Sequence, residues 1–198
     1  MELLSPIISS IALCISLFTA WFTILRRGTI RSTRPSFIAF RYDFVGKIHP
    51  QAKIFLRALL YSTGKRGLVL ENLFLRVWEG ARSEEFAFWG HGDKDLVRGS
   101  GLFVGENGVV TNHHFNPINS ETLFVFSPGV YDLELVAKLV NRSRLVTLTK
   151  VTLNLPESAF DHQISADTAV YFNWSPSEQR YLASIERRDE ALLLKRQV

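Results

Sequence analysis

Cysteine is nearly absent from this 198-residue chain, in which Cys14 is the only one. A single cysteine cannot form a disulfide within the chain, so the disulfide-stabilised class of small secreted domains is excluded. Internal repeats and low-complexity runs are absent as well. Helical periodicity is lacking between the β-type segments, which argues against a parallel α/β sheet.

Charged residues are absent from Leu3 to Leu25. As a helix this segment would be about 34 Å long, which is enough to cross a hydrocarbon core of roughly 30 Å. A cleaved signal peptide would need a basic start and a shorter apolar run, and this run instead ends at Arg26-Arg27. We therefore predict an uncleaved transmembrane anchor over residues 1–27.

Basic residues follow this span, whereas only Glu2 and the terminal amine precede it. By the positive-inside rule, the N-terminus lies outside the cell membrane and the C-terminal domain is cytoplasmic. An aromatic residue at the end of the span and the arginines that follow it are the expected membrane-interface residues: Trp21, Arg26, Arg27, Arg31 and Arg34.

The excess of positive charge is confined to the same region. Residues 26–41 contain arginine but no acidic residue, and together with Glu2 they account for the whole net charge of +4. A nucleic-acid-binding protein would carry its excess on the folded domain, so nucleic acid is not an expected partner. A basic linker over residues 28–35 instead predicts contact with anionic headgroups of the lipid bilayer.

Small residues recur at every fourth position within the span, at Ala12, Ser16 and Ala20. Such a stripe permits two helices to approach closely in lipid. We therefore hypothesise that the protein forms a homo-oligomer through this helix.

Segments rich in branched and aromatic residues dominate from residue 36 to residue 188 and are separated by turn residues. Short strands with this punctuation predict an antiparallel β-sandwich. The expected strands are 36–44, 53–62, 67–78, 84–89, 121–126, 130–140 and 145–155.

One of these segments, SPGVYDLELVAKLV at 127–140, resembles the tyrosine-corner strand of immunoglobulin-like sandwiches. The matching positions are Gly129, Tyr131, Leu133, Leu135 and Ala137. The resemblance implies an immunoglobulin-like fold, and 145–155 would then be the last strand of the core sandwich. The usual cysteine pair is missing, so an antibody-type domain is not implied. As a whole, the arrangement resembles uncharacterised single-pass bacterial membrane proteins, and this resemblance transfers no activity.

The C-terminal region allows two interpretations. Residues 170–186 alternate as a hairpin would, with Val170, Phe172 and Trp174 opposite Tyr181, Ala183 and Ile185. Yet Ser175-Pro176-Ser177-Glu178 also fits the capping box of a helix. The clean alternation favours the hairpin. A tail over residues 189–198 contains Leu192–Leu194.

A glycine-rich stretch at 98–117 has the wrong spacing for a phosphate-binding loop, and no lysine or helix follows it. Ser100 lies directly between Gly99 and Gly101, which is not the spacing of a nucleophile elbow. We predict instead a tight turn at Asn107-Gly108 that joins Leu102–Val104 to Val109-Val110 in a hairpin.

Histidines are the remaining candidates for chemistry. His113 and His114 are neighbours on a predicted strand, so their side chains are expected on opposite faces. A metal or acid–base site could still combine one of them with His91, Asp93 or Asp95, which lie in the expected turn at 90–95. The prediction is that they form no metal site and that no cofactor binds.

We therefore expect a non-catalytic interaction or scaffolding module, whose protein partner binds at a sheet face, an edge strand or the Leu192–Leu194 tail. Two alternatives stay open. One is an enzyme or metal-binding domain around His91, Asp93, His113 and His114. The other is a sandwich exposed outside the cell, as in receptors or adhesion proteins.

Overall fold

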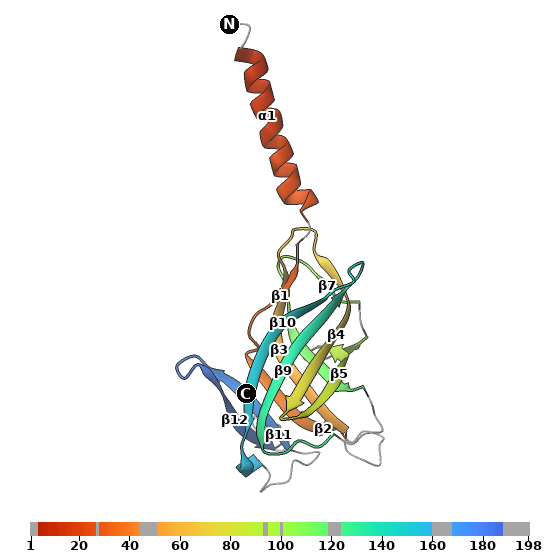
Figure 1. The fold of residues 1–198 in the computed structure, drawn as a ribbon, viewed down its shortest axis with the longest axis vertical. Helices are drawn as coiled ribbons and strands as arrows, with labels where there is room; N and C mark the ends of the chain where they lie inside the picture. Colours follow the sequence, from red (N-terminus) through yellow and green to blue (C-terminus); the bar gives the residue numbers. More distant parts are fainter. Residues whose placement is uncertain are drawn as a thin grey trace.

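The computed structural model describes residues 4–26, 28–43, 51–92, 95–99, 101–118, 124–159 and 168–187. They form an N-terminal helix and a β body that follows directly from it (Figure 1). The predicted tail at 189–198 lies outside the described residues.

The helix comprises α1 (Leu4–Ala20) and a π-helical turn, η1 (Trp21–Leu25). Its segment Ser5–Thr23 is long and apolar enough to cross a membrane, and none of it is buried against the β body. A signal sequence would meet the same criteria of length and composition. Four of its hydroxyl groups donate to carbonyl oxygens four residues earlier, as in Ser16 Oγ to Ala12 O at 2.8 Å, so these four need no water: Ser10, Ser16, Thr19 and Thr23.

The β body is mainly one antiparallel sheet, in the order β10-β9-β4-β5-β8-β3-β2-β11-β12, with three short strands beside this path. The strands are β1 (Ile30–Ser32), β2 (Phe37–Asp43), β3 (Gln51–Ser62), β4 (Leu68–Glu79), β5 (Arg82–His91), β6 (Val97–Arg98), β7 (Phe103–Val104), β8 (Val109–Pro117), β9 (Gly129–Leu139), β10 (Leu145–Leu155), β11 (Thr168–Ser175) and β12 (Arg180–Arg187). A 3-10 turn, η2 (Glu157–Ala159), follows β10.

This single sheet curves almost into a barrel, because β12 at one end of the strand order approaches β10 at the other (Figure 1). The predicted antiparallel, mainly β class is confirmed. The predicted sandwich of two facing sheets is not, since the long strands accumulate enough twist to bring the sheet round on itself. β10 is therefore followed by two more strands of the same sheet rather than ending the core.

The core fills the inside of this curved sheet. Alternate residues point inward along each long strand, as Ile54, Leu56 and Leu60 do on β3. Stacked and edge-on aromatic rings around Phe40 pack the centre, with the Phe126 ring 4.5 Å away and the Tyr131 ring 5.3 Å away.

The hairpin predicted at 170–186 is confirmed in its register. Val170 pairs with Ile185, Phe172 with Ala183, and Trp174 with Tyr181. The alternative helix is wrong, although Ser175 Oγ does accept the N–H of Glu178 within the turn. The predicted strand at 145–155 coincides with β10. Of the strand predicted at 121–126, residues 124–126 are described by the structure, and they form no strand.

The hairpin predicted around Asn107-Gly108 is wrong in its pairing. The turn exists, with the Gly108 N–H donating to Gly105 O at 3.2 Å, and Gly108 has a φ of +72°, but Asn107 does not share that conformation. β7 pairs with the start of β4, whereas β8 pairs with β3 and β5. β8 forms more backbone pairs with β3 and β5 than the two-residue strand β7 could offer, so β8 does not pair with β7.

Candidate functional site

The predicted histidine site is divided between two faces of the sheet. His91 and His113 are register partners on β5 and β8, and both rings lie 6.2 Å from the ring of Phe88. His113 is fully buried, whereas His114 packs on the outer face. Asp93 lies outside the described residues. Within the described residues, no group of three or more potential metal ligands comes together.

His114 belongs to an outer-face cluster that sequence reasoning missed. Its ring stacks on Phe55 at 5.5 Å and meets Trp89 edge-on at 6.4 Å. Lys53 is nearly buried here, 3.0 Å from Asp43 and 4.4 Å from the centre of the Trp89 ring. Burial, reinforced by the Lys53 charge, lowers the pKa of His114 to about 4. A neutral imidazole at physiological pH fits a packing role.

The predicted membrane-interface residues that the structure describes lie in three places. Trp21 and Arg26 are exposed at the end of the helix, and Arg31 is exposed on β1. Arg34 instead stacks on the sheet, with its guanidinium carbon 3.8 Å from the centre of the Trp174 ring. Arg27 lies outside the described residues. On α1, Ala12 and Ser16 are exposed and Ala20 is partly so.

The junction between the helix and the β body is tightly tied. The Thr29 N–H donates to Thr63 Oγ1 at 2.8 Å, and the Thr63 N–H donates to Thr29 O at 2.9 Å. Arg142 Nη2 donates to Gly28 O at 2.6 Å. A Cβ on Gly28 would lie 2.2 Å from Gly64 N, so the segments around Gly28 and Gly64 are in contact through their glycine backbones. β1, within the segment predicted as a linker, pairs with β3.

Three turns surround this junction, at 63–67, 105–108 and 140–144, and we call this end of the β body the helix-proximal pole (Figure 1). A pocket of about 240 Å³ lies between the first and last of them and the start of the chain after the helix. Arg66 and Arg142 line it, and none of the described lining residues is acidic.

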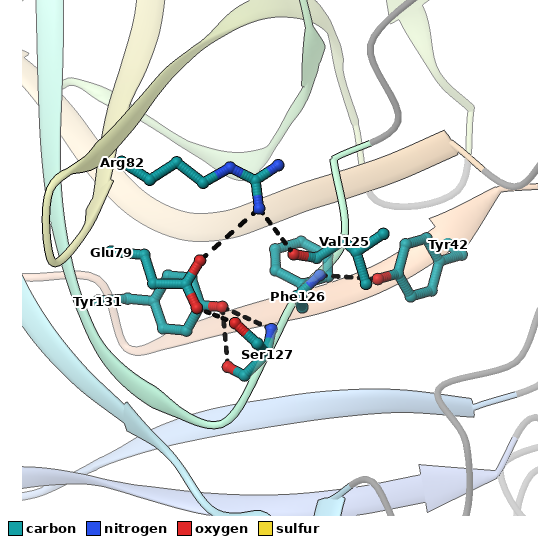
Figure 2. Close-up of polar contacts among 7 residues, drawn as sticks. All are labelled: Tyr42, Glu79, Arg82, Val125, Phe126, Ser127 and Tyr131. Atoms are coloured by element: carbon teal, nitrogen blue, oxygen red, sulfur yellow. Dashed lines mark hydrogen bonds and ion pairs between the residues drawn. The ribbon is translucent and has the colours of Figure 1, made fainter.

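The opposite end of the β body carries a polar network around residues 124–127, which Figure 2 shows. Tyr131 Oη accepts the N–H of Ser127 and donates to its carbonyl oxygen, both at 2.8 Å. Tyr42 Oη accepts the N–H of Phe126 at 2.8 Å, and Arg82 donates to Val125 O at 3.3 Å. Ser127 Oγ also bonds to Glu79. The network holds this segment across the end of the barrel-like sheet and is structural.

Burial raises the pKa of Tyr131 to about 12, against the effect of its hydrogen bonds with Ser127. Burial likewise raises the pKa of Tyr42. Both phenols therefore stay protonated at physiological pH and keep a proton to donate.

A charge ladder crosses the outer face of four adjacent strands. Register pairs bring Glu85, Arg76, Glu134 and Lys150 into one row across β5, β4, β9 and β10. Arg76 lies 3.0 Å from Glu85 and 3.7 Å from Glu134, and Lys150 lies 3.1 Å from Glu134. Thr147 Oγ1 also donates to Glu134 at 2.8 Å.

Glu134 remains ionised in this row. Burial acts to raise its pKa, but the hydrogen bonds from Thr147 and Lys150 and the charges of Lys150 and Arg76 together hold that pKa below the ordinary value.

Beside the ladder, a groove of about 480 Å³ opens on the outer face of β4 and β5. Its walls combine apolar and charged groups: Arg76, Trp78, Ser83, Glu84, Glu85 and Ile118. Ile118 is 58% exposed, although its N–H is held by Glu85 O at 3.0 Å. Sequence alternation places Trp78 and Arg76 on one face of β4, but only the fold brings Ile118 to them.

Among known proteins, no family model matches the chain, and no curated protein matches it either. No relative therefore supports the resemblance to single-pass bacterial membrane proteins or to immunoglobulin-like domains.

Proposed function

We propose that this protein is a membrane-anchored, non-catalytic interaction module, with the N-terminus outside and the β body on the cytoplasmic side. The apolar helix and the arginines after it support this topology. The hydrogen bonds between Thr29 and Thr63 support a fixed presentation, because they hold the β body against the end of the helix.

The groove beside the charge ladder is the observation that carries the proposal. Trp78 and Ile118 supply apolar contact area there, and Arg76, Glu84 and Glu85 supply charges of both signs. Tryptophan and arginine are enriched among the residues that dominate binding at protein interfaces, whereas carboxylates such as Glu84 and Glu85 are usual at the polar rim. The ion pairs of the ladder fix the side chains of Arg76 and Glu85 beside the groove, so a folded protein partner or an extended peptide would find these groups preorganised.

The metal-binding alternative is less well supported, because His114 lies on the face of β8 opposite to His91 and His113.

The external alternative keeps the same fold and differs only in topology. A reporter that is active only in the cytoplasm, fused to the C-terminus, distinguishes a cytoplasmic β body from an external one. An inactive fusion whose domain can be labelled from outside would refute the cytoplasmic placement.

Partner binding is tested by photocrosslinking in native membranes with the full chain. A photoreactive residue at Ser83, inside the groove, should give a discrete adduct that Trp78→Ala abolishes. The matched control carries the same probe at Asn173, an exposed strand residue away from the groove, and should give none. Adducts that are equal at both positions, or no adduct at Ser83, would refute the groove as the binding surface.

Self-association through Ala12, Ser16 and Ala20 is a second element of the proposal. Ser16 bonds within its own helix, so its small size rather than its hydroxyl would matter. Ser16→Leu should then reduce crosslinked dimer in membranes, whereas Leu13→Ile should not. Equal dimer yields in both variants would remove this element.

A further inference from the structure

We propose that the pocket at the helix-proximal pole binds the headgroup phosphate of an anionic phospholipid, with Arg66 and Arg142 as its ligands. The site rests on the proposed membrane anchorage and adds to it a specific lipid contact by the β body.

The pocket lies where the span ends. Gly28, which lines it, lies three residues after the helix ends at Leu25, and a Cβ on Gly64 across the pocket would lie 3.5 Å from Arg26 O. If Ser5–Thr23 fills the hydrocarbon core, these residues stand at the depth of the headgroups. A lipid phosphate would reach the pocket without leaving its own layer.

The charge of the pocket fits a phosphate. Arg142 uses one N–H on Gly28 O, which fixes the side chain over the pocket and leaves further donors for a ligand. Arg66 is exposed, and within the described part of the chain its guanidinium has no protein acceptor. Two guanidinium groups beside an anion are a common means of binding phosphate. Glu106, on the neighbouring turn at 105–108, is not among the lining residues.

The size of the pocket also limits the ligand. Its volume of about 240 Å³ lies below the roughly 300–1,000 Å³ of pockets that enclose a whole drug-sized ligand. It therefore fits one headgroup whose acyl chains remain outside.

Exposed apolar side chains at the same pole supply an independent reason for a lipid rather than a soluble phosphate. Within the described residues, several large apolar groups of the β body are exposed close to these three turns: Val69, Phe103, Val110, Val140 and Leu145, at 40%, 58%, 54%, 43% and 45%. Val69 pairs with Phe103, and the Val140 N–H donates to Val69 O, so three of them are neighbours.

Such side chains gain about 25 cal/mol per Å² of apolar area when they leave water. Apolar side chains beside basic ones match the boundary between acyl chains and anionic headgroups. A free phosphate ion would engage the arginines but not these residues.

The experiment uses the full chain released from membranes in mild detergent, and native mass spectrometry counts retained lipids. The probes are dioleoylphosphatidylglycerol and dioleoylphosphatidylcholine at equal concentration. The unmodified chain should retain one phosphatidylglycerol, and Arg66→Gln should lower that retention at least fivefold. Arg144→Gln removes the same charge from the same pole outside the pocket and should lower it less than twofold.

Equal losses in the two variants would overturn the site, because they would show a diffuse charge effect. Displacement of the lipid by millimolar inorganic phosphate would overturn it in favour of a soluble anion. Arg66→Gln is used first since Arg142 also ties the junction. Arg142→Lys, which keeps the charge but not the paired donors, should give an intermediate loss.

A separate experiment distinguishes failure of the proposed membrane anchor from failure of the lipid site. In nanodiscs, a nitroxide on Phe103→Cys in a Cys14→Ser background should be accessible to oxygen more than to a water-soluble nickel complex. A water-exposed nitroxide together with extraction of the chain by carbonate would refute the membrane anchor. A water-exposed nitroxide on a chain that carbonate leaves in the membrane would refute only the lipid site.

Discussion

Tyr131 binds both backbone groups of Ser127, four residues earlier in the chain, through one phenolic oxygen (Figure 2). This is the tyrosine-corner contact that the spacing of Gly129 and Tyr131 suggested. It occurs here in a single sheet that is nearly closed, so the local motif does not specify a two-sheet sandwich. The reason is that the contact depends only on the turn between residues 127 and 131.

Tyr131→Phe should destabilise the β body by about 1–3 kcal/mol, because it leaves a partly buried N–H and carbonyl of Ser127 without their partner. Denaturant unfolding of the full chain in detergent micelles measures this. The matched control is Tyr171→Phe, since no hydrogen bond of the Tyr171 hydroxyl occurs within the described residues. Equal losses in both variants would contradict the assignment.

Glu134→Gln should destabilise the protein by about 1–3 kcal/mol at neutral pH, because Thr147, Lys150 and Arg76 all lose their charged acceptor. The pKa of Glu134 is lower folded than its ordinary 4.5, so its contribution is present above that pH and is lost as the pH falls below it. As the pH is lowered below about 4.5, the free energy of unfolding should therefore fall less in the variant than in the unmodified chain.

The control for this prediction is Glu178→Gln, which breaks an exposed pair with Arg180. It should change stability by less than about 1 kcal/mol. A Glu134 variant that behaves like this control would mean that the ladder contributes no more than surface charge.

The sequence predicted the long strands better than it predicted their arrangement, although the strand expected at 121–126 does not form in the described residues. Alternation with period two located β10 to the residue and the register of β11 with β12, because both follow from neighbours along the chain or across a short turn. Closure of the sheet depends on twist summed over many strands. The pairing of β8 with β3, in place of the predicted pairing with β7, joins residues some fifty positions apart in the chain.

The same distinction holds for the candidate sites. Alternation correctly placed His113 and His114 on opposite faces, since that is a property of one strand. The groove at Trp78 and the pocket between Gly28 and Arg142 are made by segments distant in sequence. No single segment carries a pattern for them, so they appear only in the folded chain.

Acid should weaken the fold through His114. Its pKa is about 4 folded against 6.5 as the ordinary value, so the unfolded chain takes up the proton first. Stability should fall as the pH drops from about 6.5 to about 4 and then level off, by at most about 1.4 kcal/mol per pH unit. His114→Phe preserves the stacking on Phe55 and should flatten this window. An unchanged slope between these pH values in the variant would contradict the assignment.

Gly28→Ala should loosen the junction between helix and β body, because the new Cβ would lie 2.2 Å from Gly64 N, a backbone atom that cannot rotate away. The Thr29 and Thr63 amides, which are bonded across this contact, should then exchange hydrogen at least tenfold faster. Gly105→Ala is the matched control at the same pole: its nearest neighbour would be 3.8 Å away, and its φ lies outside the left-handed region. Equal exchange at Thr29 in the two variants would mean that the β body is tethered by the chain alone and is free to turn beneath the helix.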